Sequence, residues 1–357
     1  MELALVGLPL SGKTTVFNAL TGASRPTGGG VPGKLDVHSA VVIVPDPRLD
    51  ALFELFPREK KVYAQITYID IAGLTKGISE GGLSGQLRNV LSQVDGFLHV
   101  VRAFENPNGP HPEESIDPQR DLDIVESEFA LVDLITVENR IARLKDEMSK
   151  GKNRTENARE LTLLEPLHAA LDEGTPLRDL DLDPSDAHSL RGYGLLSLKP
   201  TLVLLNMGEQ PRDPAELATL THRQSALLAI QAELEMEIAQ LAPDEAAVFL
   251  EEYGIEQPMR ERVIRKSYEL LGVLTFFTIG DNEVRAWPAP VGITAQSAAG
   301  VIHTDMERGF IRAEIIEHDT LLALGGMAEA RQAGKLRLEG KNYVIQDGDV
   351  MTVRFNV

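Results

Sequence analysis

Cysteine is absent from this chain of 357 residues, so neither disulfide bonds nor zinc thiolate centres support its fold. Long apolar runs are absent as well: none reaches the length of a transmembrane helix, and the first apolar segment meets a glycine within seven residues. These absences argue against a disulfide scaffold, a membrane span and a signal peptide. They agree with a reducing cytoplasm, where we expect the protein to act.

Positive charge is scarce: 35 Lys and Arg stand against 54 Asp and Glu, for a formal net charge of −19. At long range this charge repels phosphate backbones, so sequence-independent binding to naked DNA or RNA is disfavoured. A large ribonucleoprotein partner stays compatible with the composition, because a local basic patch acts within one Debye length.

The chain is too long for one ordinary domain, and two or three are expected. Apolar strand candidates alternate with helical stretches over most of the chain, which predicts a mostly parallel sheet covered on both faces. The expected strands are 2–7, 37–44, 62–71, 96–104, 201–206 and 226–230, and the expected helices include 13–20, closed by Gly22, and 83–94.

Residues 122–148 interrupt this alternation. Their apolar residues recur at steps of three and four, which predicts a long amphipathic helix. A second helical segment, 155–171, follows a polar turn at Gly151. We expect an antiparallel helical hairpin inserted into the α/β domain. From the residues alone, a solvated structural arm is favoured over a binding role.

After an expected helix at 259–271, short strands predict a compact C-terminal domain with one helix, which starts after Thr294, on a small mixed sheet. The expected strands are 274–279, 284–287, 310–316, 335–338, 343–346 and 350–355, with a turn at 347–349. We therefore predict a nucleotide-binding domain at 1–118 and 196–273, a hairpin at 119–195 and a third domain at 274–357.

Residues 7–14 read Gly-Leu-Pro-Leu-Ser-Gly-Lys-Thr and match G-x-x-x-x-G-K-[ST] at every fixed position. In such a loop backbone N–H groups surround the phosphates, the lysine reaches the β and γ oxygens and the hydroxyl ligates Mg²⁺. The alternative is a chance glycine-rich turn, but a strand precedes the motif and a helix follows it. The residues expected to contact nucleotide here are Leu10, Ser11, Gly12, Lys13, Thr14 and Thr15.

Asp70-Ile-Ala-Gly73 ends the third apolar strand. Asp70 can hold the hydration shell of the Mg²⁺ that Thr14 ligates, and Gly73 can present its N–H to the γ-phosphate. Leu74 stands where Ras-like enzymes carry the glutamine that orients the attacking water. Leucine neither donates nor accepts, so another group must position that water.

Asn206-Met207-Gly-Glu209 follows a buried strand, where guanine-specific enzymes carry Asn-Lys-x-Asp. Glu209 is one methylene longer than aspartate and overshoots the paired contact with guanine. Asn206 can pair with N7 and the N6 amine of adenine, and Met207 can pack on a purine face. We expect ATP to bind at least as tightly as GTP. An ordinary strand-end turn is the alternative.

His111 lies in a loop rich in proline and glycine, Asn-Pro-Asn-Gly-Pro-His-Pro. From the residues alone a solvated side chain is favoured, although histidine can serve as acid, base or donor near neutral pH.

Several stretches together resemble the YchF family of Obg-like ATPases, in the translation-factor class of P-loop proteins, over nearly the whole chain. They are GLPLSGKTT (7–15), PDPRLD (45–50), DIAGLTKG (70–77), HVVRAFEN (99–106), LKPTLVLLNMGE (198–209), EVRAWP (283–288), AAGVIHTDMERGFIRAE (298–314) and EGKNYVIQDGDVMTVRFNV (339–357). The last two resemble the family's TGS domain, a ubiquitin-like β-grasp module. The resemblance implies a Ras-like G domain, a coiled-coil insertion, preference for adenine, hydrolysis without the glutamine and association with ribosomes. It also implicates His111 in hydrolysis.

Two departures from the family pattern stand out. Leu10-Ser11 replace the usual asparagine-valine, with little effect on the phosphate-contacting backbone. Lys34 falls where the first switch carries a threonine, and neither Thr27 nor Ser39 is in register with that position. We expect altered sensing of Mg²⁺ and γ-phosphate, and slow or differently triggered hydrolysis.

The sequence thus predicts a monomeric, ribosome-associated nucleotide switch with weak ATPase activity. Lys13 and His111 are its expected catalytic residues, and Thr14 and Asp70 its expected Mg²⁺ ligands. One alternative is a nucleotide-binding scaffold without useful turnover. Another is a true GTPase in which Glu209 does the work of the aspartate.

Overall fold

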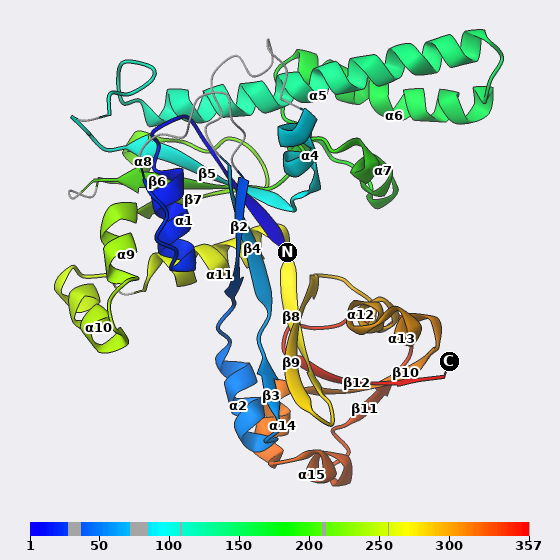
Figure 1. Cartoon of the computed structure of the whole chain (residues 1–357). Helices are drawn as coiled ribbons and strands as arrows, with labels where there is room; N and C mark the ends of the chain where they lie inside the picture. Colours follow the sequence, from blue (N-terminus) through cyan, green and yellow to red (C-terminus); the bar gives the residue numbers. More distant parts are fainter. Residues whose placement is uncertain (28–36, 72–84, 108, 209–211, 256, 357) are drawn as a thin grey trace. The chain divides into compact units, whose positions relative to one another are not determined.

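The structure is a computed structural model that describes residues 1–27, 37–71, 85–107, 109–208, 212–255 and 257–356 (Figure 1). Lys34, Gly73, Leu74 and Glu209, on which the sequence makes predictions, lie outside the described residues. The chain divides into two compact units. One comprises Glu2–Ala40 and Thr67–Lys266, and the other comprises Met1, Val41–Ile66 and Ser267–Val357.

A six-stranded sheet forms the centre of the first unit, with the strand order β2-β4-β1-β5-β6-β7. β1 pairs in parallel with β4 and β5, and β5, β6 and β7 continue in parallel. Because the carboxyl ends of parallel strands meet at one edge, the ends of β1, β4, β5 and β6 gather there. The bounds are β1 Glu2–Val6, β2 Val37–Ile43, β4 Gln65–Ile71, β5 Gly96–Ala103, β6 Thr201–Met207 and β7 Ser225–Ile230.

The first helix, α1 (Lys13–Thr21), leaves the loop after β1 directly. It ends as predicted at Gly22, whose φ of 71° is a left-handed C-cap that glycine adopts without steric cost. α1 packs beside α9 (Ala232–Ile238), and α4 (Gly85–Gln93) packs on the sheet together with the inserted helix α5.

The predicted hairpin is formed by α5 (Pro118–Ser149) and α6 (Arg154–Asp172), joined by a short turn (Figure 1). Asp117 caps α5 by accepting a hydrogen bond from the N–H of Arg120, and Pro118 occupies the first helical position. Both are sequence signals that place the start of α5 a full turn before residue 122.

The first half of α5 is part of the core. The rings of Phe129 and Phe97 lie 4.9 Å apart, and Val125 and Val132 join the same buried cluster. The carboxylate of Asp133 accepts hydrogen bonds from the N–H groups of residues 196 and 197 at 2.8 and 2.7 Å. The interpretation of the insertion as a solvated arm is therefore wrong for this half of the helix, whereas the second half packs mainly on α6 and the segment that follows it.

The second unit holds a mixed sheet with the order β11-β10-β12-β8-β9-β3. Helix α12 starts after Thr294 as predicted, and α13, α14 and α15 were not expected. The bounds are β3 Lys60–Val62, β8 Val273–Ile279, β9 Glu283–Pro290, β10 Phe310–Glu317, β11 Arg337–Glu339, β12 Asp349–Phe355, α12 Ala295–Ile302, α13 Thr304–Arg308, α14 His318–Leu324 and α15 Met327–Gln332.

The segment Val41–Ile66 belongs to this second unit, although the sequence assigned residues 1–118 as a whole to the nucleotide-binding domain. Its strand β3 adds to the sheet beside β9, and its helix α2 (Pro47–Leu55) carries Arg48. The guanidinium of Arg48 forms ion pairs with Asp46 at 2.8 Å and with Asp347 at 2.6 Å. These contacts between residues far apart in the chain have no sequence signature.

The strand predicted at 343–346 does not form, apart from an isolated bridge between Val344 and Thr294. The carboxylate of Asp349 accepts hydrogen bonds from the N–H of Gln346 and the hydroxyl of Tyr343, both at 2.9 Å. The backbone of residues 343 and 345 instead pairs with residues 295 and 293, and the side chain of Asp349 holds the turn that precedes β12.

Three further α-helices are short, and each begins at a proline. They are α7 Pro184–Leu190, α8 Pro214–Leu217 and α10 Pro243–Glu252, while α11 spans Met259–Leu271 as predicted. Within the described ranges, no helix combines the length and apolar character that crossing a membrane requires.

Candidate nucleotide-binding site

Two glycines give the loop between β1 and α1 its course. Gly7 has φ of 141°, and a Cβ there would lie 2.3 Å from the carbonyl oxygen of Val100. Gly12 has φ of 94°, and a Cβ there would lie 2.3 Å from Nδ2 of Asn206. Any other residue at either position would push the loop away from the sheet. The glycines of the motif therefore bring the loop into close contact with β5 and β6.

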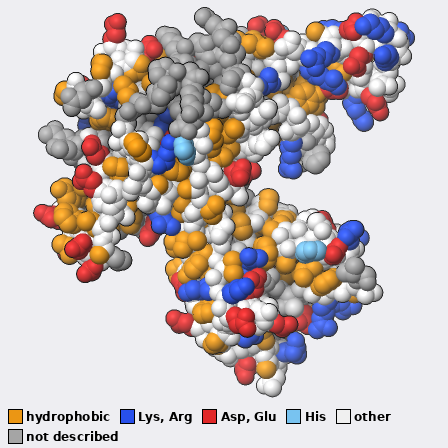
Figure 2. Space-filling view, viewed as in Figure 1, with side chains coloured by type: hydrophobic (Ala, Val, Ile, Leu, Met, Phe, Trp, Pro, Cys, Tyr) orange, Lys and Arg blue, Asp and Glu red, His pale blue; other side chains and the backbone are white. Residues whose placement is uncertain are grey.

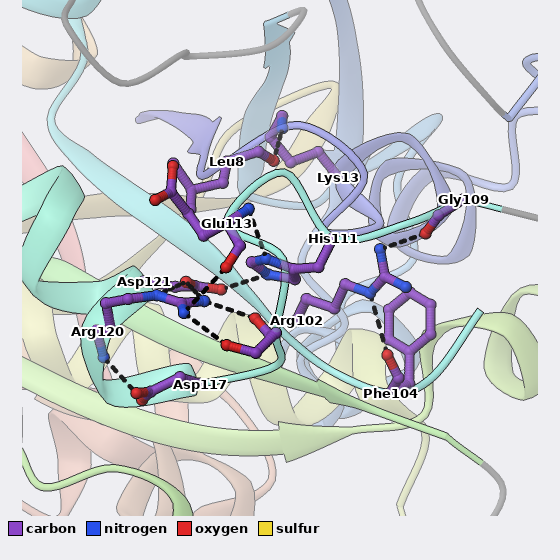
Figure 3. Close-up of polar contacts among 11 residues, drawn as sticks. Leu8, Lys13, Arg102, Phe104, Gly109, His111, Glu113, Asp117, Arg120 and Asp121 are labelled. Atoms are coloured by element: carbon purple, nitrogen blue, oxygen red, sulfur yellow. Dashed lines mark hydrogen bonds and ion pairs between the residues drawn. The ribbon is translucent and has the colours of Figure 1, made fainter. Parts of the chain in front are cut away.

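Lys13 is folded back into its own loop. Its ammonium donates hydrogen bonds to the carbonyl oxygens of Gly7 at 3.0 Å and Leu8 at 2.7 Å (Figure 3). Burial lowers the pKa of Lys13 to about 8, although the nearby charge of Asp70 raises it in part. The ammonium is therefore incompletely compensated, and an arriving phosphate would supply the missing negative charge.

Thr14 and Asp70 meet as the sequence predicts. The hydroxyl of Thr14 donates to Oδ2 of Asp70 at 3.1 Å. Oδ1 of the same carboxylate is buried and has no hydrogen-bond partner within the described part of the chain. A hydroxyl and a carboxylate with spare lone pairs are the hard oxygen donors that Mg²⁺ prefers, so these residues fit the predicted metal.

Asn206 binds the phosphate loop through its side-chain amide. Its Nδ2 donates to the carbonyl oxygen of Ser11 at 3.1 Å, and its Oδ1 accepts from the N–H of Ala232 at 3.2 Å. The side chain is buried and joins the phosphate loop, the end of β6 and the start of α9. Positioning of the loop is therefore the role that these contacts support. Any pairing of Asn206 with a base would use the second hydrogen of its Nδ2 and the second lone pair of its Oδ1.

Met207 is buried against apolar side chains. Its side chain is 5% exposed and packs with Leu205, Leu217 and Ala218 in an apolar cluster. The expected packing of Met207 on a purine does not fit this burial. A methionine at the end of a strand has the same signature whether it faces ligand or core, so the sequence could not separate the two.

The other loop residues differ in exposure. Leu10 is 42% exposed with a left-handed φ of 62°, whereas Ser11 is buried and its hydroxyl oxygen lacks a partner among the described residues. Thr15 lies partly exposed in the first turn of α1, directly after Thr14. The structure thus brings the expected contacts from Leu10 to Thr15 together with Asp70 and Asn206.

His111 is buried, so the solvated side chain favoured from the sequence is wrong. Its Nε2 lies 2.7 Å from Oδ2 of Asp121, and its Nδ1 accepts a hydrogen bond from the N–H of Glu113 at 3.1 Å (Figure 3). Because Nδ1 accepts, the ring carries its proton on Nε2 and donates to Asp121. Both ring nitrogens are thus engaged within the protein.

The loop that carries His111 is held beside the phosphate loop. Arg102, at the end of β5, donates to the carbonyl oxygens of Phe104 at 3.0 Å and Gly109 at 2.9 Å. A Cβ built on Gly109 would lie 3.6 Å from the side chain of Leu10. His111 therefore belongs to a segment in contact with the nucleotide loop.

Three residues of this region escaped the sequence reading. Arg25 forms an ion pair with Asp70, Asp121 binds His111, and His99 is buried in β5 with its pKa lowered to about 3 by burial and by the charges of Lys13 and Arg178. Arg25 lies in a loop without periodicity, and the other two sit at ordinary core positions of a helix and a strand. Only the tertiary fold brings them to the site.

Fold and site together define a P-loop protein of the GTPase class. A family model described as "50S ribosome-binding GTPase" matches residues 2–140, and the model of the C-terminal domain of YchF GTPases, described as a protein of unknown function, matches residues 273–356. The chain belongs to the YchF family of Obg-like ATPases, which confirms the resemblance read from the motifs and the predicted fold class.

The relatives align over the entire chain. "Ribosome-binding ATPase YchF" of Pasteurella multocida is 41% identical, and the alignment covers 99% of that protein. The protein of the same name in Bacillus subtilis is 40% identical, and the alignment covers 100% of it. "Obg-like ATPase 1" of Oryza sativa is 36% identical and 92% covered. The structure of the Schizosaccharomyces pombe YchF GTPase matches with a TM-score of 0.81 at 29% identity, covering 99% of this chain and 97% of that one.

We predict that triphosphate affinity falls as pH rises above about 8, the pKa of Lys13 in the empty site. Phosphate oxygens favour the charged ammonium and raise this pKa, so binding above pH 8 must take up a proton. Calorimetric titration with Mg²⁺ and an ATP analogue should show affinity lower by about tenfold for each pH unit above this pKa, up to the pKa of the bound state.

The matched control is Lys13→Ala, which should bind triphosphate far more weakly and show none of this pH dependence. Equal wild-type affinities at pH 7 and pH 9.5 would contradict the assignment of Lys13 as the phosphate-binding cation.

Proposed function

We propose that this chain binds Mg-ATP at the P-loop, hydrolyses it slowly and acts as a nucleotide-dependent switch on ribosomes. The observation that carries the proposal is the buried ammonium of Lys13 beside the incompletely satisfied carboxylate of Asp70. The printed names of the relatives, ribosome-binding and Obg-like ATPases, support ATP as the nucleotide and the ribosome as the partner. A ribosomal partner agrees with the expected cytoplasmic location.

Each residue has a distinct part in this proposal. Lys13 leaves the carbonyl oxygens of its loop and binds the β and γ oxygens, while Thr14 and Asp70 hold Mg²⁺ and its waters. When bound, the metal neutralises charge on the phosphates. Asn206 keeps the loop on the sheet, and Gly73 is proposed to present its N–H to the γ-phosphate.

His111 is the proposed group that positions or activates the attacking water, since Leu74 cannot. In the structure its Nε2–H is bound to Asp121, so this role requires His111 to exchange that partner for one at the γ-phosphate. A loop held by backbone hydrogen bonds to Arg102 can make such a local change without loss of the fold. Slow intrinsic turnover is the expected consequence.

The ribosomal contact that we favour lies on strands β10 and β12 in the sheet of the second unit. Arg312 on β10 stands directly opposite Arg354 on β12, an arrangement of like charges that is unfavourable by itself. Exposed apolar side chains border the pair, and together they line a shallow depression whose residues are Ile311, Arg312, Leu338, Val353, Arg354 and Phe355. RNA phosphates, with bases that stack on apolar groups, suit such a surface.

The helical hairpin is the second candidate for this contact. Figure 2 shows Lys and Arg side chains on the outer part of the hairpin, where Lys145 and Lys150 have side chains that are each 60% exposed. Residues 274–357 contain eight Lys or Arg against eleven Asp or Glu, so the sheet surface does not lie in a generally basic domain. A local contact is therefore expected from either one.

Arg312→Glu should weaken salt-sensitive co-sedimentation with ribosomes while leaving the melting temperature unchanged or raised. The new carboxylate faces Arg354 across the strand pair, and opposite charges at that position stabilise a sheet. Lys145→Glu on the hairpin is the matched control and should sediment like wild type. The reverse pattern, with only the hairpin variant released, would place the contact on the hairpin.

His111→Ala should slow single-turnover hydrolysis by about tenfold or more while nucleotide affinity stays nearly constant. Asp121→Asn, which keeps the shape of the pair but weakens its hold on the imidazole, should preserve or raise the rate. If His111→Ala lowered only the melting temperature and left the rate intact, the histidine would merely hold its loop. If Lys13→Ala slowed hydrolysis and His111→Ala did not, Lys13 would be the sole catalytic residue of the two.

For the base, we expect ATP to bind at least as tightly as GTP, and Glu209→Asp to shift preference toward GTP by about fivefold or more. The single substitution is preferable to one combined with Met207→Lys, because Met207 is buried in an apolar cluster where an ammonium would destabilise the fold. Competition binding measures the preference of wild type between ATP and GTP and its shift in Glu209→Asp. Tenfold tighter binding of GTP by wild type would favour the GTPase alternative.

A further inference from the structure

A guanidinium occupies one side of the metal-binding carboxylate. Nη1 of Arg25 lies 2.8 Å from Oδ2 of Asp70, the same oxygen that accepts the hydroxyl proton of Thr14. The side chain of Asp70 is 5% exposed and that of Arg25 is 24% exposed, so the pair is largely shielded from water. The cation of Arg25 thus binds the carboxylate that the proposed function assigns to Mg²⁺, at the oxygen to which Thr14 also donates.

Arg25 is held in place by the helix that carries the phosphate-binding residues. The buried side chain of Asn18 accepts from the N–H of Arg25 at 3.1 Å and donates to its carbonyl oxygen at 2.9 Å. The guanidinium lies 6.0 Å from the ring centroid of Phe17, within the range of a cation–π contact. Asn18 and Phe17 both belong to α1, so the backbone of Arg25 is fixed relative to Lys13 and Thr14.

We propose that Arg25 is an internal counter-ion for Asp70 that Mg²⁺ must displace when it arrives with nucleotide, so that Arg25 sets the metal affinity of the site. This inference rests on the proposed Mg-nucleotide binding and names a residue that controls it. A divalent cation at either oxygen of this buried carboxylate would lie close to the guanidinium on Oδ2, and the two cations would repel each other strongly. Binding of the metal therefore includes the cost of breaking the ion pair.

The test compares nucleotide affinity with and without Mg²⁺. A fluorescent ATP analogue is titrated into full-length wild type, Arg25→Gln and Arg25→Lys, once in EDTA and once in saturating Mg²⁺. The ratio of the two affinities measures the coupling between metal and nucleotide. For Arg25→Gln this ratio should rise about tenfold, the size expected for a charge-assisted hydrogen bond that is partly open to solvent. Arg25→Lys keeps the charge and should stay close to wild type.

A second variant guards against misfolding of the first. Asn18→Ser releases the backbone of Arg25 but keeps its charge, and should raise the ratio in the same direction by a smaller factor. Melting temperatures without nucleotide are measured for every variant.

An unchanged or reduced ratio in both Arg25→Gln and Asn18→Ser would overturn the inference, while nucleotide binding, and with it the proposed function, would stand. A loss of affinity in EDTA as large as that in Mg²⁺ would also overturn it, because Arg25 would then bind phosphate rather than compete with the metal. Failure of wild type to bind the analogue in either condition would refute the proposed function and the inference together.

Discussion

Buried charge that lacks a full partner is the constraint on which the site depends. Among the described residues, the ammonium of Lys13 is bound only to carbonyl oxygens of its own loop, and burial lowers its pKa to about 8. The carboxylate of Asp70 is bound to Thr14 and Arg25 and keeps one oxygen without a partner among the described residues. These internal partners keep the loop and the acidic strand end in place without ligand. They are also weaker partners than phosphate and a divalent cation would be, so we expect ligand binding to replace them.

The strands and segments around the phosphate loop hold it next to the end of β4. Parallel strands bring the ends of β1, β4, β5 and β6 to one edge, and two glycines let the loop approach that edge closely. Asn206 fastens the loop from one side, and the segment held by Arg102 approaches it from another. The inserted hairpin is anchored to the same core through Phe129 on Phe97 and through Asp133. The phosphate loop thus contacts β5, and β5 in turn packs on α5.

The sequence predicted those features that local chemistry determines. The P-loop, the position of Asp70, most strands and the two long helices follow from motif spacing and periodicity, and the structure has them within a few residues. Features made by distant contacts escaped prediction. Residues 41–66 join the second unit through the β3–β9 pairing and the Arg48–Asp347 ion pair, and residues 343–345 pair with 293–295 in place of the expected hairpin. Likewise, the burial of His111, the core position of Met207 and the Arg25–Asp70 pair depend on the packing of several segments. Helix α2 was missed despite its Asp46 cap and Pro47, signals that local reading can use.

A structure determined with Mg²⁺ and a non-hydrolysable ATP analogue tests the central claim most directly. The account predicts that the ammonium of Lys13 leaves the carbonyl oxygens of Gly7 and Leu8 for phosphate oxygens, and that Arg25 leaves Asp70, which then faces the metal and its waters. The account would be contradicted by a bound nucleotide with Lys13 still on those carbonyl oxygens, or by Arg25 still paired with Asp70 beside the bound metal.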